Sequence, residues 1–260
     1  MRKITINLAA VAAFCIVVAS PALVSSSCAT PKTEQEDTTI IREDSGITAL
    51  KYSSPEVPAS IEFCGKTIDL SRFDRHERMD RELLAFTYMH STSLQMLKKA
   101  NRYFPIVEPI LKENGIPDDF KYLMVIESNM NPTARSSAGA AGLWQFMQGT
   151  GRDYGLEVNN NVDERYHIEK ATRAACRYLK DAYAKYKDWV AVAASYNAGQ
   201  ARIASQLAKQ DVDDSLDLQL VEETARYVYR ILAAKQLFNA PTTFGFRLRA
   251  SDLYPPIPYT

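Results

Sequence analysis

Residues 189–198 read WVAVAASYNA, and the expected fold class follows from this stretch. A helix of this sequence is apolar on nearly every side, which is typical of a helix buried in a protein core. The preceding segment, 170–187, repeats apolar side chains at three- and four-residue spacing, as an amphipathic helix does. A last long helix with one apolar line is expected over about 220–238. Together these segments predict an all-α fold.

Further helices are expected upstream, and no convincing strand or hairpin pattern accompanies them. Their expected ranges are 79–90 with Asp80 as the starting cap, 92–102, from near Pro105 to Asn114, and from the turn at 116–120 to just past Glu127. Proline favours the first turn of a helix, and glycine favours the position after its last turn. Pro105 and Gly115 therefore set the expected ends of the third helix.

Glu127 is the carboxyl group whose surroundings suggest chemistry. It follows the apolar run YLMVI (122–126), and Pro132 disfavours helical geometry at Asn131, so the helix must stop nearby. A carboxyl group at the end of an apolar helix is partly desolvated, which favours its neutral acid form. Such an acid could protonate a glycosidic oxygen. Taken alone, a solvated helix-terminal glutamate is the simpler interpretation.

Charge and histidine content argue against several function classes. Lys+Arg and Asp+Glu each total 31, so no basic surface for nucleic acid is indicated. His76, His90 and His167 are far apart in sequence, and neither HExxH nor CxxC occurs. We therefore expect no nucleic-acid partner, no metal and no other cofactor, and the sequence indicates no particular protein partner.

The first residues are typical of an export signal. Arg2 and Lys3 precede an apolar run from Leu8 to Ala19, and small residues follow up to Ser27. The run is shorter than the roughly 20 apolar residues of a membrane-spanning helix. Residues 1–27 are therefore expected to be a signal peptide that directs the chain out of the cytoplasm.

Cys28 resembles the acceptor cysteine of a bacterial lipoprotein, although Ser25 stands where such signals usually have Leu. The polar, Pro- and Ser-containing segment 28–60 has the composition of a flexible linker and would tether an acylated chain. This favours a periplasmic protein anchored in the outer membrane through Cys28. Ordinary signal cleavage near Ala29 is the alternative.

Two cysteines, Cys64 and Cys176, remain beyond this signal. In an oxidising compartment they could form a disulfide, but the sequence favours two buried free thiols at least as much. Spacing in sequence does not separate these possibilities.

Three stretches, in order, resemble the catalytic domain of the soluble lytic transglycosylase (SLT) family. They are ESNMNPTARSSAGAAGLWQFM (127–147), AASYNAG (193–199) and ETARYV (223–228), and VDER (162–165) is similar to the membrane-bound lytic transglycosylase D subgroup. The resemblance implies a goose-type, lysozyme-like helical domain that cleaves peptidoglycan. We recognise none of the LysM repeats that many relatives in that subgroup carry, so the helical domain itself is expected to bind the glycan.

With this resemblance the chain divides into five expected segments: signal peptide 1–27, linker 28–60, N-terminal helical extension 61–90, lytic transglycosylase catalytic domain 91–240 and irregular tail 241–260. The resemblance also implies roles for individual residues. Glu127 corresponds to the catalytic acid/base, and the expected substrate-binding residues are Ser136, Gln145, Tyr196, Asn197 and Tyr227.

The implied reaction needs only one carboxyl group. Glu127 protonates the bond between N-acetylmuramic acid and N-acetylglucosamine, then accepts the proton of the muramoyl C6 hydroxyl as a 1,6-anhydro ring closes without water. A lysozyme-type muramidase would use two carboxylates, for which Glu157 and Asp163 are candidates. A non-catalytic peptidoglycan-binding protein is the third possibility.

Some motif residues have purely structural alternatives. Trp144 could be a core residue or a sugar platform, and Tyr196 could serve packing alone. The charged residues Asp163, Glu164 and Arg165 are expected to stabilise the fold rather than to act in catalysis.

Overall fold

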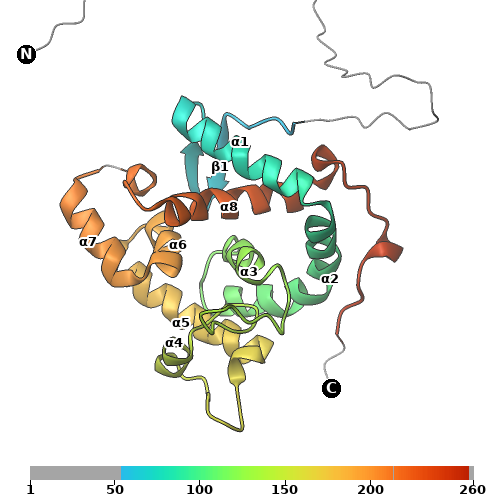
Figure 1. Ribbon diagram of the computed structural model, residues 1–260, viewed down its shortest axis with the longest axis vertical. Coiled ribbons are helices and arrows are strands. Elements are labelled where there is room, and N and C mark those ends of the chain that lie inside the picture. Colours follow the sequence, from blue (N-terminus) through green and yellow to red (C-terminus); the bar gives the residue numbers. More distant parts are fainter. Residues whose placement is uncertain (1–53, 213, 258–260) are drawn as a thin grey trace, which may run out of the picture. The chain divides into compact units, whose positions relative to one another are not determined.

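The chain is mainly helical in the computed structural model, which describes residues 54–212 and 214–257 (Figure 1). The prediction of an all-α fold is confirmed, with the addition of one small hairpin. The helices of the described residues are α1 (Phe73–Tyr88), α2 (His90–Glu113), α3 (Phe120–Ser128), α4 (Gln148–Asp153), α5 (Ile168–Tyr186), α6 (Trp189–Ala198), α7 (Gln200–Gln210) and α8 (Glu222–Asn239). The expected signal peptide, Cys28 and most of the expected linker lie outside the described residues.

The helix α3, which ends in the candidate acid, is enclosed by other helices (Figure 1). It packs against α2 and α8, while α5 packs against α2 and α6, and α6 against α8. Seven of the nine α3 residues are buried. The apolar stretch 189–198 forms α6, with Val190 to Ser195 buried, as its composition predicts. A rigid core therefore supports the end of α3.

Two predicted helix boundaries upstream are wrong. α1 begins at Phe73, before Asp80, and α2 runs through Pro105 instead of starting there. Proline removes one hydrogen bond and tends to kink a helix. The apolar face of α2 continues past Pro105 through buried Ile106, Val107 and Ile110, so burial outweighs the lost bond. Figure 1 shows α2 changing direction along its length. The short helix α7, which begins after Gly199, was not predicted.

The segment 61–90 is not purely helical, because a β-hairpin precedes α1. Strand β1 (Ser60–Phe63) pairs antiparallel with β2 (Lys66–Asp69), and Ile61 faces Ile68. Cys64 and Gly65 have φ values of +53° and +81°, the left-handed geometry of a two-residue hairpin turn. The Cys64 amide donates to Asp119 at 2.7 Å, which ties the turn to the start of α3.

α1 lies along α8 (Figure 1), and an ion pair with a buried carboxylate joins the two helices. Glu82, whose side chain is 2% exposed, accepts hydrogen bonds from Arg226 at 2.6 and 3.1 Å. Removing Arg226 would take both hydrogen bonds from the buried Glu82 carboxylate and leave it only a longer contact with Arg81 at 3.7 Å, which is destabilising. The N-terminal extension is therefore a structural part of the helical unit.

The C-terminal segment up to residue 257 has short 3₁₀ turns at Pro241–Phe244 and Ala250–Asp252 and no longer regular element. Its Tyr254 returns to α2, where the Tyr254 amide donates to the Lys98 carbonyl at 3.0 Å and the Tyr254 carbonyl accepts from Asn101 at 2.9 Å. Half-buried Cys64 and buried Cys176 are both free thiols.

No helix among the described residues combines the length and apolarity needed to cross a membrane.

Candidate active site

Glu127 lies in the last turn of α3, half-buried, as the sequence indicates. The helix ends because Asn129 and Met130 adopt left-handed φ values of +48° and +55°. Asn131 then accepts a hydrogen bond from the Thr133 amide at 3.1 Å and closes a tight turn before the next loop. The carboxyl group thus sits where a buried helix meets an open loop.

The surroundings of Glu127 raise its pKa from an ordinary 4.5 to about 7. Burial is the main cause, because a desolvated carboxylate loses its hydration. The negative end of the α3 dipole also opposes ionisation at this position. The site therefore contains an acid that is largely protonated below neutral pH and can also act as a base once it has ionised.

Tyr227 of α8 donates a hydrogen bond to Glu127 Oε1. Tyr227 is 3% exposed, and burial together with the Glu127 charge raises its pKa well above the ordinary tyrosine value, so it remains a donor. This bond favours the ionised carboxylate and lowers the pKa of Glu127. The sequence-based expectation that Tyr227 approaches the carboxyl group agrees with this geometry.

Two charged residues of α8 also act on Glu127. Arg230 lowers the pKa of Glu127 through its positive charge, and Glu223 raises it through its negative charge. Neither residue was predicted from the sequence. Glu223 lies inside the quoted ETARYV stretch, and Arg230 follows two residues after its end. Glu223, Tyr227 and Arg230 follow one another at spacings of four and three residues, which places them on one side of a helix. This spacing could have indicated that they lie near Glu127 together.

Tyr196 of α6 lies close enough to Glu127 for the charge of Glu127 to act on it. Burial raises its pKa well above the ordinary value, and the Glu127 charge raises it further. Its hydroxyl donates to the Trp144 carbonyl at 2.8 Å, and its ring packs edge-on against Tyr178 with 5.1 Å between ring centres. Tyr196 therefore has a packing role and also lies within electrostatic range of the candidate acid.

Asn197, next to Tyr196, connects α6 to the start of α8. Its Oδ1 accepts from the Thr224 hydroxyl at 2.8 Å, and its Nδ2 donates to Glu223 Oε1 at 3.4 Å. This amide orients Glu223, so Asn197 supports the charged side of the site.

The loop 134–146 follows Glu127 and is fastened to the helical core by two side chains. Trp144 is fully buried, and its Nε1 donates to the Thr172 hydroxyl of α5 at 2.9 Å. Arg165 is 4% exposed and donates to the carbonyls of Gly139 and Phe146 at 2.8 and 2.9 Å. Trp144 is thus a core residue, and Arg165 is structural, as expected for the 163–165 cluster.

Ser136 and Gln145 lie in this loop, but no hydrogen bond joins either to Glu127 in the described part of the chain. Ser136 is exposed, and its Oγ accepts from the Ala140 amide at 3.0 Å. Gln145 has a φ of +49°, and its Nε2 donates to the carbonyls of Gly142 and Ala134 at 2.8 and 3.2 Å. Both side chains shape the loop, and their predicted contact with a sugar stays a prediction.

The two carboxylates considered for a muramidase are engaged elsewhere. Asp163 binds Arg165 through Oδ1 and Oδ2 at 2.8 and 2.6 Å, which lowers the pKa of Asp163. Glu157 is exposed and accepts from Asn159 Nδ2 at 2.8 Å. Within residues 54–212 and 214–257, no three His, Cys, Asp or Glu side chains gather as a metal-binding group.

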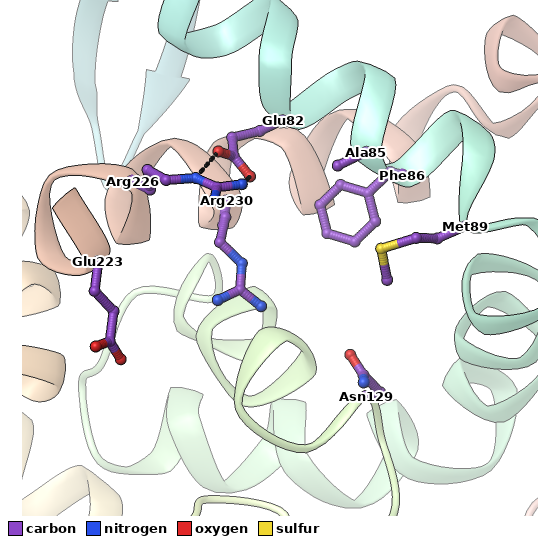
Figure 2. A pocket seen from close by; sticks show the side chains of 8 residues that line it. All are labelled: Glu82, Ala85, Phe86, Met89, Asn129, Glu223, Arg226 and Arg230. Atoms are coloured by element: carbon purple, nitrogen blue, oxygen red, sulfur yellow. Dashed lines mark hydrogen bonds and ion pairs between the residues drawn. The ribbon is translucent and has the colours of Figure 1, made fainter.

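A cavity of about 260 Å³ opens beside the end of α3, between α1 and α8 (Figure 2). Its lining residues come from α1, the α1–α2 junction, the turn after α3, and α8: Glu82, Ala85, Phe86, Met89, Asn129, Glu223, Arg226 and Arg230. Asn129 in this lining lies two residues beyond Glu127, and Glu223 and Arg230 also act on Glu127 through their charges.

Residues 105–217 match the family model described as "Transglycosylase SLT domain". This part of the chain belongs to the SLT family. The SLT match includes Glu127, the loop 134–146 and α6, whereas Tyr227, Glu223 and Arg230 lie beyond its last residue.

Curated relatives agree with the SLT assignment. The chain is 30% identical over 181 residues to "Membrane-bound lytic murein transglycosylase D" of Escherichia coli (strain K12), covering 68% of this chain and 39% of that protein. It is 29% identical over 150 residues to "Membrane-bound lytic murein transglycosylase C" of Haemophilus ducreyi, covering 52% and 40%. The chain thus spans about two fifths of the length of these relatives.

Two further similarities are more partial. "Peptidoglycan transglycosylase gp16" of Escherichia phage T7 is 30% identical over 138 residues, covering 51% of this chain and 10% of that protein. A solved structure of an inactive mutant of lytic transglycosylase Slt from Pseudomonas aeruginosa shares 21% identity at a TM-score of 0.46, covering 55% of this chain and 24% of that chain.

The loop fastening can be tested with a matched glycine pair. A Cβ at Gly142 would lie 1.9 Å from the Arg165 carbonyl oxygen, whereas a Cβ at Gly139 would meet nothing within 4 Å, although both φ values are positive. We expect Gly139→Ala to cost about 1–2 kcal/mol of unfolding free energy from backbone strain alone. Gly142→Ala should cost clearly more in urea unfolding monitored by circular dichroism. Equal costs would contradict the close contact.

The electrostatic environment of Glu127 predicts a set of opposite pH shifts. If protonated Glu127 is required, kcat/KM falls as pH rises through about 7. Tyr227→Phe removes an interaction that lowers the pKa of Glu127, so this fall should move to higher pH. Glu223→Gln removes a charge that raises the pKa, so the fall should move to lower pH. Shifts in the same direction would contradict these assignments, whatever the activity level.

Proposed function

We propose that this protein is a peptidoglycan lytic transglycosylase that cleaves the β-1,4 bond between N-acetylmuramic acid and N-acetylglucosamine and leaves 1,6-anhydro-muramoyl ends. The observation that carries the proposal is Glu127, whose raised pKa suits both proton donation and proton acceptance near neutral pH. The SLT match and the printed names of the curated relatives support the substrate class.

In the proposed reaction, protonated Glu127 donates its proton to the glycosidic oxygen as the bond from muramoyl C1 to that oxygen breaks. The Tyr227 hydrogen bond then stabilises the Glu127 carboxylate that forms. The C6 hydroxyl of the same muramoyl sugar attacks C1, and its proton passes to Glu127. The ring closes, the leaving sugar keeps the first proton, and Glu127 regains its starting form.

A muramidase would release the same strands with water added at C1. The geometry does not favour Glu157 or Asp163 as the base, because Asp163 is paired with Arg165 and Glu157 is exposed and bonded to Asn159. Glu223 is the further carboxylate that acts on Glu127, and it is held by Asn197. Product mass separates the two reactions, since anhydromuropeptides are one water lighter than hydrolysed muropeptides.

Glu127→Gln is the variant that tests the mechanism. Glutamine keeps the size and a hydrogen-bond acceptor for Tyr227 but cannot transfer a proton, so release of anhydromuropeptides from purified sacculi should fall at least about 1,000-fold. Mass spectrometry of the products and a glycan-binding assay would be run on both proteins. Wild-type release of only reducing-end products, or an active variant, would refute the proposal. Circular dichroism would check that the variant is folded, so that its loss of activity is not caused by unfolding.

The substrate class places the proposed activity in the cell envelope, and we propose a periplasmic enzyme attached to the outer membrane through an acylated Cys28. The support is the sequence of residues 1–60: a positive start, an apolar run, Cys28 and a polar linker. Such a linker of about 30 residues would span roughly 30 Å as a flexible chain, which would let the helical unit reach the nearby wall.

Cys28→Ala should move the protein from the membrane fraction to the soluble periplasmic extract, because the acyl acceptor is lost. Immunoblotting of fractionated cells measures this shift, and Cys64→Ala is the matched control that should leave the distribution unchanged. Wild-type protein that is already soluble after fractionation would contradict the anchor.

A further inference from the structure

Four cationic side chains on α2 and the C-terminal segment have no acidic partner among residues 54–212 and 214–257. They are Lys98, Lys99 and Arg102 of α2 and Arg247 of the C-terminal segment, and we call them the α2 basic face. The acidic residues of α2 and of segment 241–257 are each paired with another cation: Glu108 with Lys121, Glu113 with Arg173 and Asp252 with Arg249. Although the charges of the whole chain balance, this surface is therefore positive.

The three cations of α2 lie on one side of the helix. Lys98 and Lys99 precede Arg102 by four and three residues, the spacing at which helical side chains are neighbours. All three are partly exposed, whereas Met96 and Val107 on the other side of α2 are fully buried. The apolar side of α2 is thus packed into the core, and its charged side faces outward.

The C-terminal segment lies along α2 and adds the exposed Arg247 to this surface (Figure 1). Phe246, the residue before Arg247, packs edge-on against His90 at the start of α2, with 6.1 Å between ring centres. Tyr254 lies further along the helix, where its ring centre is 5.0 Å from Lys98 Nζ. The segment therefore follows α2 and presents its own cation beside those of the helix.

Exposed aliphatic side chains flank the α2 basic face. Leu94, one turn before Lys98, is 37% exposed. Ile257 follows Pro255, whose carbonyl accepts from Arg102 at 3.1 Å, and is 43% exposed. A phospholipid surface offers a match for both kinds of group, with phosphate anions for the cations and an apolar zone below the headgroups for the aliphatic side chains. A soluble polyanion would match the cations alone.

We propose that the α2 basic face binds a phospholipid surface with anionic headgroups, with Leu94 and Ile257 entering the headgroup layer. Each Lys or Arg close to such a surface strengthens binding by about fivefold. We expect this contact to be lost during cell fractionation once an anchor has been removed. For a chain that is already tethered to the membrane, the high local concentration makes a weak second contact effective. Tether and face together would fix which side of the helical unit is turned toward the membrane.

Vesicle sedimentation measures this contact directly. The background is the full chain with Cys28→Ala, in which no acyl chain contributes, and the probes are vesicles of phosphatidylglycerol and of phosphatidylcholine. The basic-face variant combines Lys98→Gln, Lys99→Gln and Arg247→Gln, and it keeps Arg102 because this side chain holds the C-terminal segment. Its partition onto phosphatidylglycerol vesicles should fall at least about 30-fold, whereas its partition onto phosphatidylcholine vesicles should change by less than about threefold.

A matched control removes the same charge elsewhere. Lys180→Gln on α5, combined with Arg202→Gln and Lys209→Gln on α7, replaces three exposed cations outside the α2 basic face. The control should lose less than about threefold in partition onto phosphatidylglycerol vesicles, because charges beyond about 8 Å are largely screened at physiological salt. An equal loss in the two variants, or no loss in the basic-face variant, would overturn the proposal.

Two further measurements apply if the basic-face variant does not fold. The charge-retaining combination of Lys98→Arg, Lys99→Arg and Arg247→Lys should bind as the background protein does. Added salt should weaken binding of the background protein to phosphatidylglycerol vesicles, because screening acts on the cations. Binding that does not depend on salt would overturn the proposal without any substitution on the face.

The combination of Leu94→Gln and Ile257→Gln separates a lipid surface from a soluble polyanion. It should weaken partition onto phosphatidylglycerol vesicles about 3- to 10-fold and leave binding of inorganic polyphosphate unchanged. An unchanged partition onto the vesicles would identify a general polyanion site and overturn the lipid assignment. The inference does not depend on the reaction proposed for Glu127, so release of muropeptides from purified sacculi should be the same in all these variants.

Discussion

The site depends on one constraint, which is that a carboxyl group must be desolvated and still be able to ionise. Burial at the end of α3 raises the pKa of Glu127, and the bond from Tyr227 limits that rise. Neither contribution is local in sequence, because Tyr227 lies 100 residues from Glu127. The packing of α3 against α8 therefore sets the acidity, and each residue that positions α8 acts indirectly on the chemistry.

The loop 134–146, which follows Glu127, is also held in place by buried hydrogen-bond donors. The loop after Glu127 has little regular structure, yet Arg165 binds two of its carbonyls and Trp144 anchors it in the core. Buried donors of this kind fix a loop because leaving any partner unbonded costs free energy. The loop can thus present an exposed face to a ligand while its backbone stays in one conformation.

Sequence patterns predicted those parts of the molecule whose determinants are local. The periodicity of 170–187 and the uniform apolarity of 189–198 correspond to α5 and α6, and Pro132 correctly marked the end of α3. The hairpin was missed because its turn has Cys64 rather than the usual Asn before Gly65. The break at Pro105 was wrong because tertiary burial carried α2 through it. Glu223 and Arg230 could not be placed near Glu127 without knowing how α8 packs.

The docking of α1 on α8 has a consequence for how the catalytic unit is delimited. The matched family segment ends at residue 217, before the whole of α8, and begins after α1. A fragment cut at those limits would lack Tyr227 and the first half of α2, and it would expose the faces of α3 and α6 that α8 covers. The packed helical unit is therefore wider than the matched family segment, and it includes α1 and α8. We expect a recombinant fragment to keep the packing around Glu127 only if it carries these flanking elements.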